Sequence, residues 1–164
     1  KLINNVKNLN TNQFILISTI DINFDHPYGK NRKNFEKFVK KNFSNYLIIR
    51  LPAVFGEGLK KNIIFDLMNK NELNKIYYND KFQWFDLSSL KNKINSITKT
   101  RKKIFEFYSE PIMNKEIIKL FKLEHEFKKR DKPVIYNFKP IDGYDSNKKL
   151  IIKALKKFIK KNEN

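Results

Sequence analysis

Two short apolar stretches and the amphipathic segment between them decide the fold of this 164-residue chain. Residues 14–17 read Phe-Ile-Leu-Ile and residues 46–49 read Tyr-Leu-Ile-Ile, without a charged side chain in either. Continuous apolar runs of this length are typical of strands that are buried on both faces of a parallel sheet. Between them, residues 29–43 carry apolar side chains at helical spacing, with Phe35 and Val39 on one stripe. Strand, helix and strand in this order predict a βαβ unit and therefore an α/β fold.

The pattern changes after Leu51-Pro52, and shorter elements are expected from there on. Residues 2–9, before the first strand, also show helical apolar spacing. Downstream, the patterns predict short strands at 75–78, 82–86 and 103–108, and helices at 61–69, 88–98, 115–122 and 147–161. We expect Asn114 to cap the helix at 115–122, and we expect Leu150 and Ile151 to face inward from the basic amphipathic helix at 147–161.

The charge of the chain is large but does not by itself identify a partner. Lys+Arg 35 against Asp+Glu 17 gives a formal net charge of +18, a balance that often indicates nucleic acid or another anionic surface. However, 31 of the 35 basic residues are Lys, and Lys, Asn, Ile and Phe, whose codons are rich in A and T, make up just over half of the chain. A genome of low GC content produces this bias without selection for a partner. Because Lys is spread through every segment, we expect any binding to nucleic acid to be non-specific.

Several classes of protein are excluded by what the sequence lacks. Without cysteine there is no disulfide scaffold, no thiolate nucleophile and no Cys-based metal site. No apolar run is long enough to span a bilayer, so no membrane partner is expected. The first residues lack both Met and the apolar region of a signal peptide, which predicts an internal piece of a cytoplasmic protein. With 40% hydrophobic and 14% aromatic residues, the chain can build a core.

Three motifs occur in an order that is known from one enzyme family. Residues 18–22, Ser-Thr-Ile-Asp-Ile, follow the first strand, residues 28–32, Tyr-Gly-Lys-Asn-Arg, open the helix, and residues 50–56, Arg-Leu-Pro-Ala-Val-Phe-Gly, follow the second strand. Residues 82–87 and 110–116 add two further matches. Together these segments resemble the extended short-chain dehydrogenase/reductase family, the NAD-dependent sugar-nucleotide epimerases and dehydratases. The resemblance implies a Rossmann-like fold.

The resemblance also implies a catalytic set at the end of the first strand and the start of the helix. Tyr28 corresponds to the family's acid/base tyrosine, which exchanges a proton with a substrate hydroxyl while a hydride moves to or from nicotinamide. Arg32 lies one helical turn further along the same face, where the family's cation lowers the tyrosine pKa and holds the nicotinamide ribose. Thr19, with Ser18 as the adjacent alternative, corresponds to the hydroxyl that hydrogen-bonds the reacting oxygen.

Further contacts, the cofactor and the partners follow from the same resemblance. Cofactor binding is expected at Tyr28, Arg32, Leu51 and Pro52, and substrate binding at Arg50, Phe55, Asn62 and Gln83. The residues alone leave a second role open for Arg50, which is pairing with a nearby carboxylate. The implied cofactor is NAD or NADP, the implied substrate is a nucleotide-linked sugar, and no metal is implied. Family members commonly dimerise through the helices at 2–9 and 29–43, so a homodimer is implied too.

The chain departs from the family pattern in ways that bear on activity. Arg32 replaces the family's Lys, which keeps the positive charge but changes its geometry. Gln83 stands where the family often has Arg. Glycine occurs only four times, and never as the phosphate-binding G-x-x-G-x-x-G or G-x-G-x-x-G. The chain therefore resembles the C-terminal portion of such an enzyme. Residues 1–55 would be the last part of its Rossmann-like NAD(P)-binding domain, and residues 56–164 a small α+β substrate-binding region.

Two alternatives stand beside an NAD(P)-dependent epimerase, dehydratase or reductase. One is a non-catalytic remnant that keeps the fold without the cofactor site, and the other is a basic nucleic-acid-binding module. A binding module would gather its basic side chains on one face, with aromatic side chains between them. The sequence leaves open whether the chain is an active enzyme, which sugar it takes and which reaction it catalyses. His26 is expected on a solvated loop close to Tyr28.

Overall fold

The computed structural model describes residues 2–162, which form two compact units. The first unit is the chain up to Leu51 together with Lys91–Phe107, and the second is Pro52–Leu90 together with the chain from Tyr108 onward. The first unit is therefore discontinuous in sequence, because a strand at residues 104–106 pairs with the sheet that the earlier residues form.

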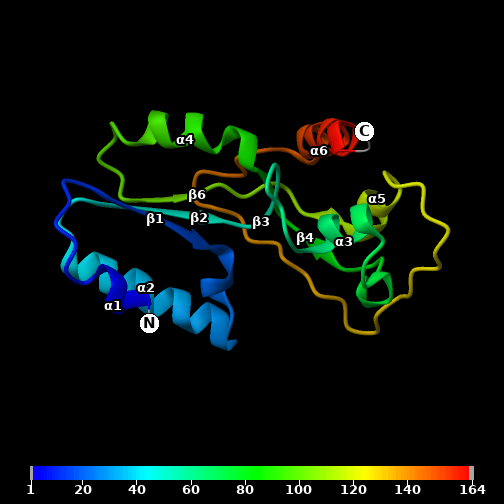
Figure 1. The fold of residues 1–164 in the computed structure, drawn as a ribbon, viewed down its shortest axis with the longest axis horizontal. Coiled ribbons are helices and arrows are strands. Elements are labelled where there is room, and N and C mark those ends of the chain that lie inside the picture. Colours follow the sequence, from blue (N-terminus) through cyan, green and yellow to red (C-terminus); the bar gives the residue numbers. More distant parts are fainter. Residues whose placement is uncertain (1, 163–164) are drawn as a thin grey trace. The chain divides into compact units, whose positions relative to one another are not determined.

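The first unit is a three-stranded parallel sheet with helices on both faces. Its elements are α1 (Leu2–Val6), β1 (Phe14–Thr19), the 3-10 helix η1 (Ile20–Asn23), α2 (Pro27–Asn42), β2 (Tyr46–Leu51), most of α4 (Leu90–Ile97) and β6 (Ile104–Glu106). The strand order is β1-β2-β6, and both pairings are parallel. Figure 1 shows α2 and α4 on opposite sides of this sheet. The predicted βαβ unit and the α/β fold class are confirmed.

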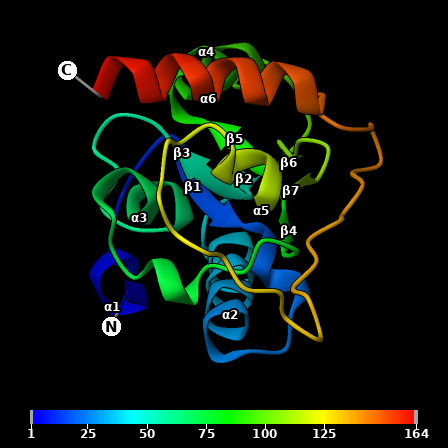
Figure 2. The same ribbon diagram turned by 90° about the vertical axis from the view of Figure 1, so that its right-hand side faces the viewer.

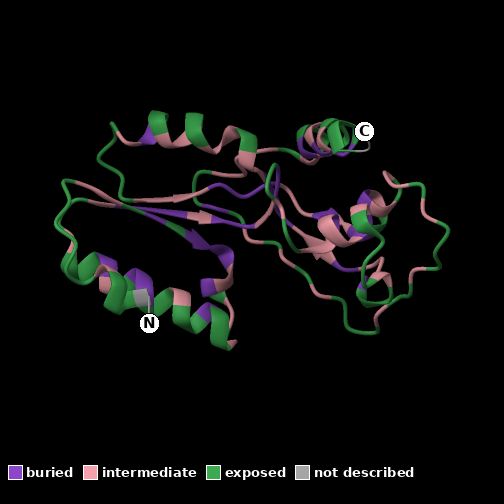
Figure 3. Cartoon of the chain, in the orientation of Figure 1, coloured by how far each residue is buried: buried purple, intermediate pink, exposed green. Residues whose placement is uncertain are grey.

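The two predicted strands differ in how deeply they are buried. Ile48 and Ile49 of β2 are fully buried, as predicted for a strand inside a parallel sheet. Figure 3 draws most of β2 in the colour of buried residues. The same prediction is wrong for β1, where Ile15 and Ile17 each keep 37% of their surface exposed while Leu16 is buried. Side chains alternate between the two faces of a strand. Leu16 packs against Phe35 and Val39 of α2, whereas Ile15 and Ile17 point to the other face, at the edge of the sheet that the described residues form.

The second unit mixes short strands and helices around its own core. It contains β3 (Ala53–Phe55), α3 (Ile63–Asn69), η2 (Leu73–Lys75), β4 (Lys81–Phe82), β5 (Trp84–Asp86), η3 (Leu87–Ser89), β7 (Ile112–Met113), α5 (Asn114–Ile118) and α6 (Lys148–Asn162). β3 pairs with β5 in parallel, and β4 pairs with β7 antiparallel. Figure 2 shows α6 as one long helix, and its buried side chains Ile151, Leu155 and Ile159 pack into the core of this unit.

Three local predictions for the second unit are wrong. The expected strand at 75–78 is replaced by the end of η2 and an isolated bridge at Tyr77. Asn114 is the first residue of α5 rather than its cap, and its side-chain amide donates to the Tyr77 carbonyl. Leu150 remains 56% exposed because it lies on the solvent side of α6.

Candidate functional site

The end of β1 and the start of α2 meet through a tight turn in the first unit. The Thr19 hydroxyl caps η1, since it accepts a hydrogen bond from the Asp21 N–H (3.2 Å) and donates one to Asp21 Oδ2 (2.8 Å). A Cβ on Gly29 would lie 2.1 Å from the Asp21 carbonyl oxygen and 2.8 Å from that of Phe24. Only glycine therefore lets η1 pass this close to the first turn of α2.

His26 caps the N-terminus of α2. Its Nδ1 accepts a hydrogen bond from the Gly29 N–H at 3.0 Å, and Pro27 occupies the first helical position. Proline at this position costs no hydrogen bond, because the N–H of a first-turn residue has no partner inside the helix. Helix α2 thus has a defined beginning, and that beginning carries Tyr28.

Tyr28 and Arg32 differ in the contacts that their side chains make. Tyr28 is 54% exposed, and its ring stacks beside that of His26 at 6.3 Å between centroids. The guanidinium of Arg32 turns back to β1 and donates to the Ile17 carbonyl. The phenol is thus accessible to a ligand, whereas the cation is tied to the strand.

Ser18 and Arg50 belong to a buried ionic network around Glu36. The Ser18 hydroxyl donates to Glu36 Oε1 at 2.6 Å. Arg50 binds both oxygens of Glu36, through Nε at 3.1 Å and Nη2 at 2.8 Å, and donates from Nη1 to Glu106 at 3.0 Å. The side chain of Glu36 is only 3% exposed and that of Arg50 is 18% exposed. Arg50 therefore takes the carboxylate-pairing role that its sequence context left open.

The network shifts the protonation of its members. Burial raises the pKa of Glu36, but the hydrogen bonds from Arg50 and Ser18 outweigh burial, and the pKa ends below its ordinary value. For Arg50, burial lowers the pKa, whereas hydrogen bonds to Glu36 and Glu106 raise it above the ordinary value. The network therefore holds its charges at neutral pH.

Two predicted substrate contacts in the second unit have structural roles. Phe55 is fully buried in the core. Asn62 caps α3, because its Oδ1 accepts from the Ile64 and Phe65 N–H groups at 3.0 and 3.3 Å while its Nδ2 donates to the Val54 carbonyl at 2.8 Å. Neither side chain presents free polar groups to a ligand.

Gln83 is also a structural residue. It is fully buried, and its Nε2 donates to the carbonyls of Ser109 and Phe138 while its Oε1 accepts from the Phe138 N–H, each at 2.8 Å. Leu51 is 3% exposed, and Pro52 is buried as well. These positions shape the backbone rather than offering side chains for recognition.

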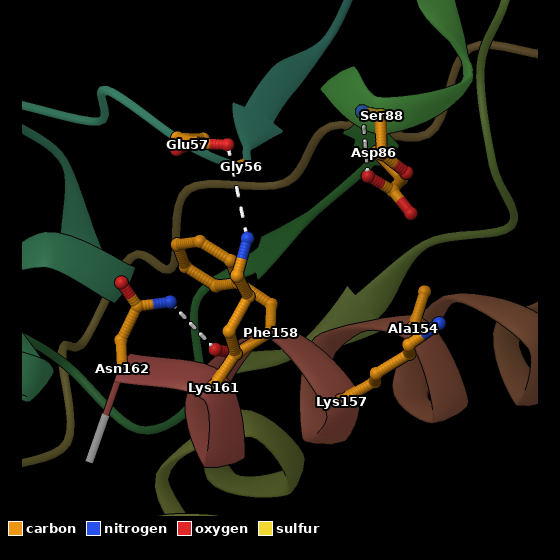
Figure 4. Close-up of a pocket in the computed structure, with 9 residues that line it drawn as sticks. All are labelled: Gly56, Glu57, Asp86, Ser88, Ala154, Lys157, Phe158, Lys161 and Asn162. Atoms are coloured by element: carbon orange, nitrogen blue, oxygen red, sulfur yellow. Dashed lines mark hydrogen bonds and ion pairs between the residues drawn. The ribbon is translucent and has the colours of Figure 1, made fainter. Parts of the chain in front are cut away.

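A cavity of about 340 Å³ lies in the second unit at the carboxyl ends of β3 and β5. Figure 4 shows it between the Gly56-Glu57 turn and Asp86 on one side and α6 on the other. Lys161 of α6 reaches Glu57 at 3.8 Å, and Asp86 Oδ1 accepts from the Ser88 N–H at 2.9 Å. The residues that line this cavity include none of the site residues that the sequence predicted.

Sequence reasoning missed three polar residues of the first unit: Asp21, His26 as a cap, and Glu36. One signal for Glu36 was present, because it lies between Phe35 and Phe38 on the apolar stripe of α2, where a charged residue needs a partner. Asp21 and His26 gave no such signal, since their contacts depend on the turn between β1 and α2.

Comparison with solved structures identifies the fold. The chain superposes on dTDP-glucose 4,6-dehydratase from Bacillus anthracis in complex with NAD with a TM-score of 0.69 at 12% identity, covering 99% of this chain and 64% of that one. For a dTDP-4-dehydrorhamnose reductase from Clostridium acetobutylicum the TM-score is 0.65 at 17% identity, covering 93% and 66%. For UDP-glucose 4-epimerase from Thermotoga maritima with UDP-glucose it is 0.58 at 14% identity, covering 90% and 62%.

These likenesses define the class of fold. The resemblance to extended short-chain dehydrogenase/reductases that the motifs predicted is confirmed at the level of the fold, which is Rossmann-like. The chain spans about one third to two thirds of the length of the structures that it resembles. Comparisons with protein-family models and with curated protein sequences found no match.

Two further findings concern the described residues 2–162. No helix among them is long and apolar enough to cross a membrane. No group of three or more potential metal-ligating side chains comes together there either.

Proposed function

We propose that this chain contributes the acid/base half of an NAD(P)-dependent active site that acts on a nucleotide-linked sugar, as an epimerase, dehydratase or reductase. One observation carries the proposal: an exposed phenol, Tyr28, stands on the first turn of the helix that follows a parallel strand. In open α/β sheets, ligands bind outside the carboxyl ends of the strands, and here Thr19 is the last residue of β1 and Tyr28 lies in the first turn of the helix that follows.

The roles of the residues follow from their contacts. Tyr28 would exchange a proton with a sugar hydroxyl, and the charge of Arg32 one turn away would favour its phenolate. Both hydroxyl candidates are buried. We favour Thr19, because the Ser18 hydroxyl donates to Glu36 in the buried network whereas the Thr19 hydroxyl lies in the turn that leads to Tyr28. Arg50 would have a structural role, because its guanidinium pairs with the buried carboxylate of Glu36.

The residues fit only one end of the cofactor. A phenol and a cation on one helix face suit the nicotinamide ribose, so Tyr28 and Arg32 would hold that part. Leu51, which pairs with Thr19 in the sheet, and the next residue, Pro52, would shape the backbone there. When bound, NAD or NADP would accept or donate the hydride. The space beside Gly29 is filled by protein carbonyls, and no glycine-rich turn for a pyrophosphate occurs in the sequence.

Two finer statements belong to the same proposal. A cytoplasmic location fits an enzyme of nucleotide sugars. A homodimer would form through α1 and α2, the helices at the positions where the family dimerises. The similar structures include a dTDP-glucose dehydratase, a dTDP-4-dehydrorhamnose reductase and a UDP-glucose 4-epimerase, which favours sugar nucleotides as the substrate class.

The test is the rate of Tyr28→Phe on a panel of dTDP- and UDP-sugars with NAD and NADP, in the natural polypeptide that contains these residues. Loss of a positioned acid/base lowers turnover by about 100- to 10,000-fold, and we expect that loss with little change in stability. Tyr46→Phe, at the opposite end of β2, is the matched control and should keep its rate. Equal turnover of Tyr28→Phe and its parent would contradict the proposal, and absence of turnover in the parent would favour the non-catalytic remnant.

A further inference from the structure

Asp21 connects the two elements that carry the proposed catalytic side chains. It lies in η1, between the end of β1 and the start of α2, and its side chain is 20% exposed. One carboxylate oxygen, Oδ2, accepts the hydroxyl proton of Thr19 at 2.8 Å. The other, Oδ1, lies 3.5 Å from Nε2 of His26. Asp21 thus contacts both Thr19, the last residue of β1, and His26, the residue that caps α2.

The contacts of His26 fix which of its nitrogens carries the proton. Nδ1 accepts a hydrogen bond from the Gly29 N–H, so this nitrogen must be unprotonated. The proton of the neutral ring is then on Nε2, which faces the Asp21 carboxylate. A carboxylate accepts hydrogen bonds only, so it matches this tautomer and opposes the other.

The imidazole in turn supports the phenol. The His26 ring lies between Phe24 and Tyr28, with centroid distances of 5.9 and 6.3 Å and interplanar angles of 13° and 14°. Stacked rings of this kind restrict each other's orientation. A change in the orientation of His26 therefore reaches Tyr28 directly, whereas the hydroxyl of Thr19 is oriented by Asp21 itself.

We propose that Asp21 is a positioning residue that holds the Thr19 hydroxyl and the His26 imidazole with its two oxygens, and so orients Thr19 and Tyr28 relative to each other. The catalytic part of this inference rests on the proposed function. The structural part stands on the contacts of Asp21 and has a readout of its own.

Asp21→Asn is a discriminating variant because an amide has one acceptor and one donor. If its oxygen accepts from Thr19, its NH₂ faces the N–H of His26 Nε2, and two donors then oppose each other. The ring must either change tautomer and give up the cap on Gly29 or turn away from residue 21. Asp25→Asn is the matched control, since it removes the same charge from the same turn, but the Asp25 side chain is 89% exposed and pairs with Lys30.

The first measurement is the ¹⁵N NMR signature of the His26 ring in this chain. His125→Gln assigns the signals, because the chain has only two histidines. We expect one neutral tautomer with the proton on Nε2 in the parent and in Asp25→Asn, and a mixed or inverted tautomer in Asp21→Asn. Thr19→Ser should keep the parent signature, because serine also donates to Asp21. An unchanged signature in Asp21→Asn, or the same change in Asp25→Asn, overturns the inference.

The second measurement is turnover in the natural polypeptide that contains these residues. We expect Asp21→Asn to lower kcat by about 10-fold with KM nearly unchanged, because misplaced groups slow the chemical step more than binding. Asp25→Asn should keep the parental rate. An unchanged kcat in Asp21→Asn, beside a Tyr28→Phe that is slow, overturns the positioning role. If Tyr28→Phe is as fast as the parent, the proposed function fails, while the tautomer of His26 still decides whether Asp21 holds the turn.

Discussion

The two units satisfy their buried polar side chains in different ways. In the first unit, Ser18, Thr19 and Glu36 bind other side chains, and most of their partners are charged. Among the described residues of the second unit, the buried polar residues are Asp80, Gln83, Ser109 and Asn114, and all four bind backbone groups of distant segments. Asp80 also pairs with the side chain of Arg130 at 3.4 Å. A network of side chains can exchange partners when a ligand or a proton arrives. A side chain that hydrogen-bonds the backbone of a distant segment, which we call a clamp, instead fixes a segment that has no regular secondary structure.

The second unit needs such clamps because much of it has no regular secondary structure. Between α5 and α6 the chain runs through residues 119–147 without a helix or a paired strand longer than a bridge. Asn79 exchanges hydrogen bonds with the backbone of Arg130, and Gln83 does so with that of Phe138. The polar residues of the first unit are thus the better candidates for chemistry, and those of the second unit are the better candidates for stability.

The largest effect is expected from removing the cation of the first network. Arg50→Met leaves the carboxylate of Glu36 buried without its main partner. Breaking a buried pair in this way costs about 3–5 kcal/mol. The measurement is the free energy of unfolding from urea denaturation. Lys30→Met removes the exposed partner of Asp25 and is the control, with an expected loss below about 1 kcal/mol. Equal losses would mean that Arg50 contributes no more than a surface charge.

A smaller loss is expected from breaking a clamp in the second unit. Gln83→Met keeps the size of the side chain but leaves the carbonyls of Ser109 and Phe138 and the Phe138 N–H without partners. We expect a loss of about 2–3 kcal/mol, the desolvation cost of unpaired buried groups. Hydrogen exchange should accelerate around Phe138 and remain unchanged in α2. Uniform acceleration in both units would contradict the separate roles of the two networks.

Gly29→Ala tests the turn that brings the site residues together. The added methyl group would overlap the carbonyl oxygens of Asp21 and Phe24, so η1 must move away from α2. Overpacking of this kind costs about 1–3 kcal/mol, although alanine favours a helix by itself. Gly58→Ala serves as the comparison, because an added Cβ there meets nothing within 4 Å and only its backbone angle is strained. The measurement is the melting temperature of both variants by thermal unfolding, and we expect the larger decrease in Gly29→Ala.

How much of this was predictable depends on how local each interaction is. The β1-α2-β2 unit followed from apolar runs and helical spacing within residues 14–51, and the proposed role of Tyr28 comes from its motif. The exposed face of β1 was not predictable, because it depends on which elements pack on each face of that strand. The clamp of Gln83 joins residues 55 positions apart, and no local pattern records such a contact. Arg50 is intermediate, since pairing with a carboxylate was one of two roles that the sequence left open, and the identity of Glu36 required the packing of α2 on the sheet.

The smallest effect distinguishes the two units by pH. Glu36 in the first unit and Glu116 in the second both have a pKa below the ordinary 4.5. In each, burial raises the pKa and hydrogen bonds outweigh it, from Arg50 and Ser18 for Glu36 and from Lys148 and the Met113 N–H for Glu116. A carboxylate whose pKa is lower in the folded state stabilises the fold above its unfolded pKa, and this contribution is lost as pH falls through the folded value. The free energy of unfolding should therefore be flat from pH 7 to about 5 and fall below about 4.

Glu36→Gln should flatten this acid limb more than Glu116→Gln, because the Glu116 side chain is 30% exposed and that of Glu36 only 3%. The measurement is urea denaturation at a series of pH values. An acid limb that Glu36→Gln leaves as steep as in the parent would show that the buried network does not control the acid stability of this protein.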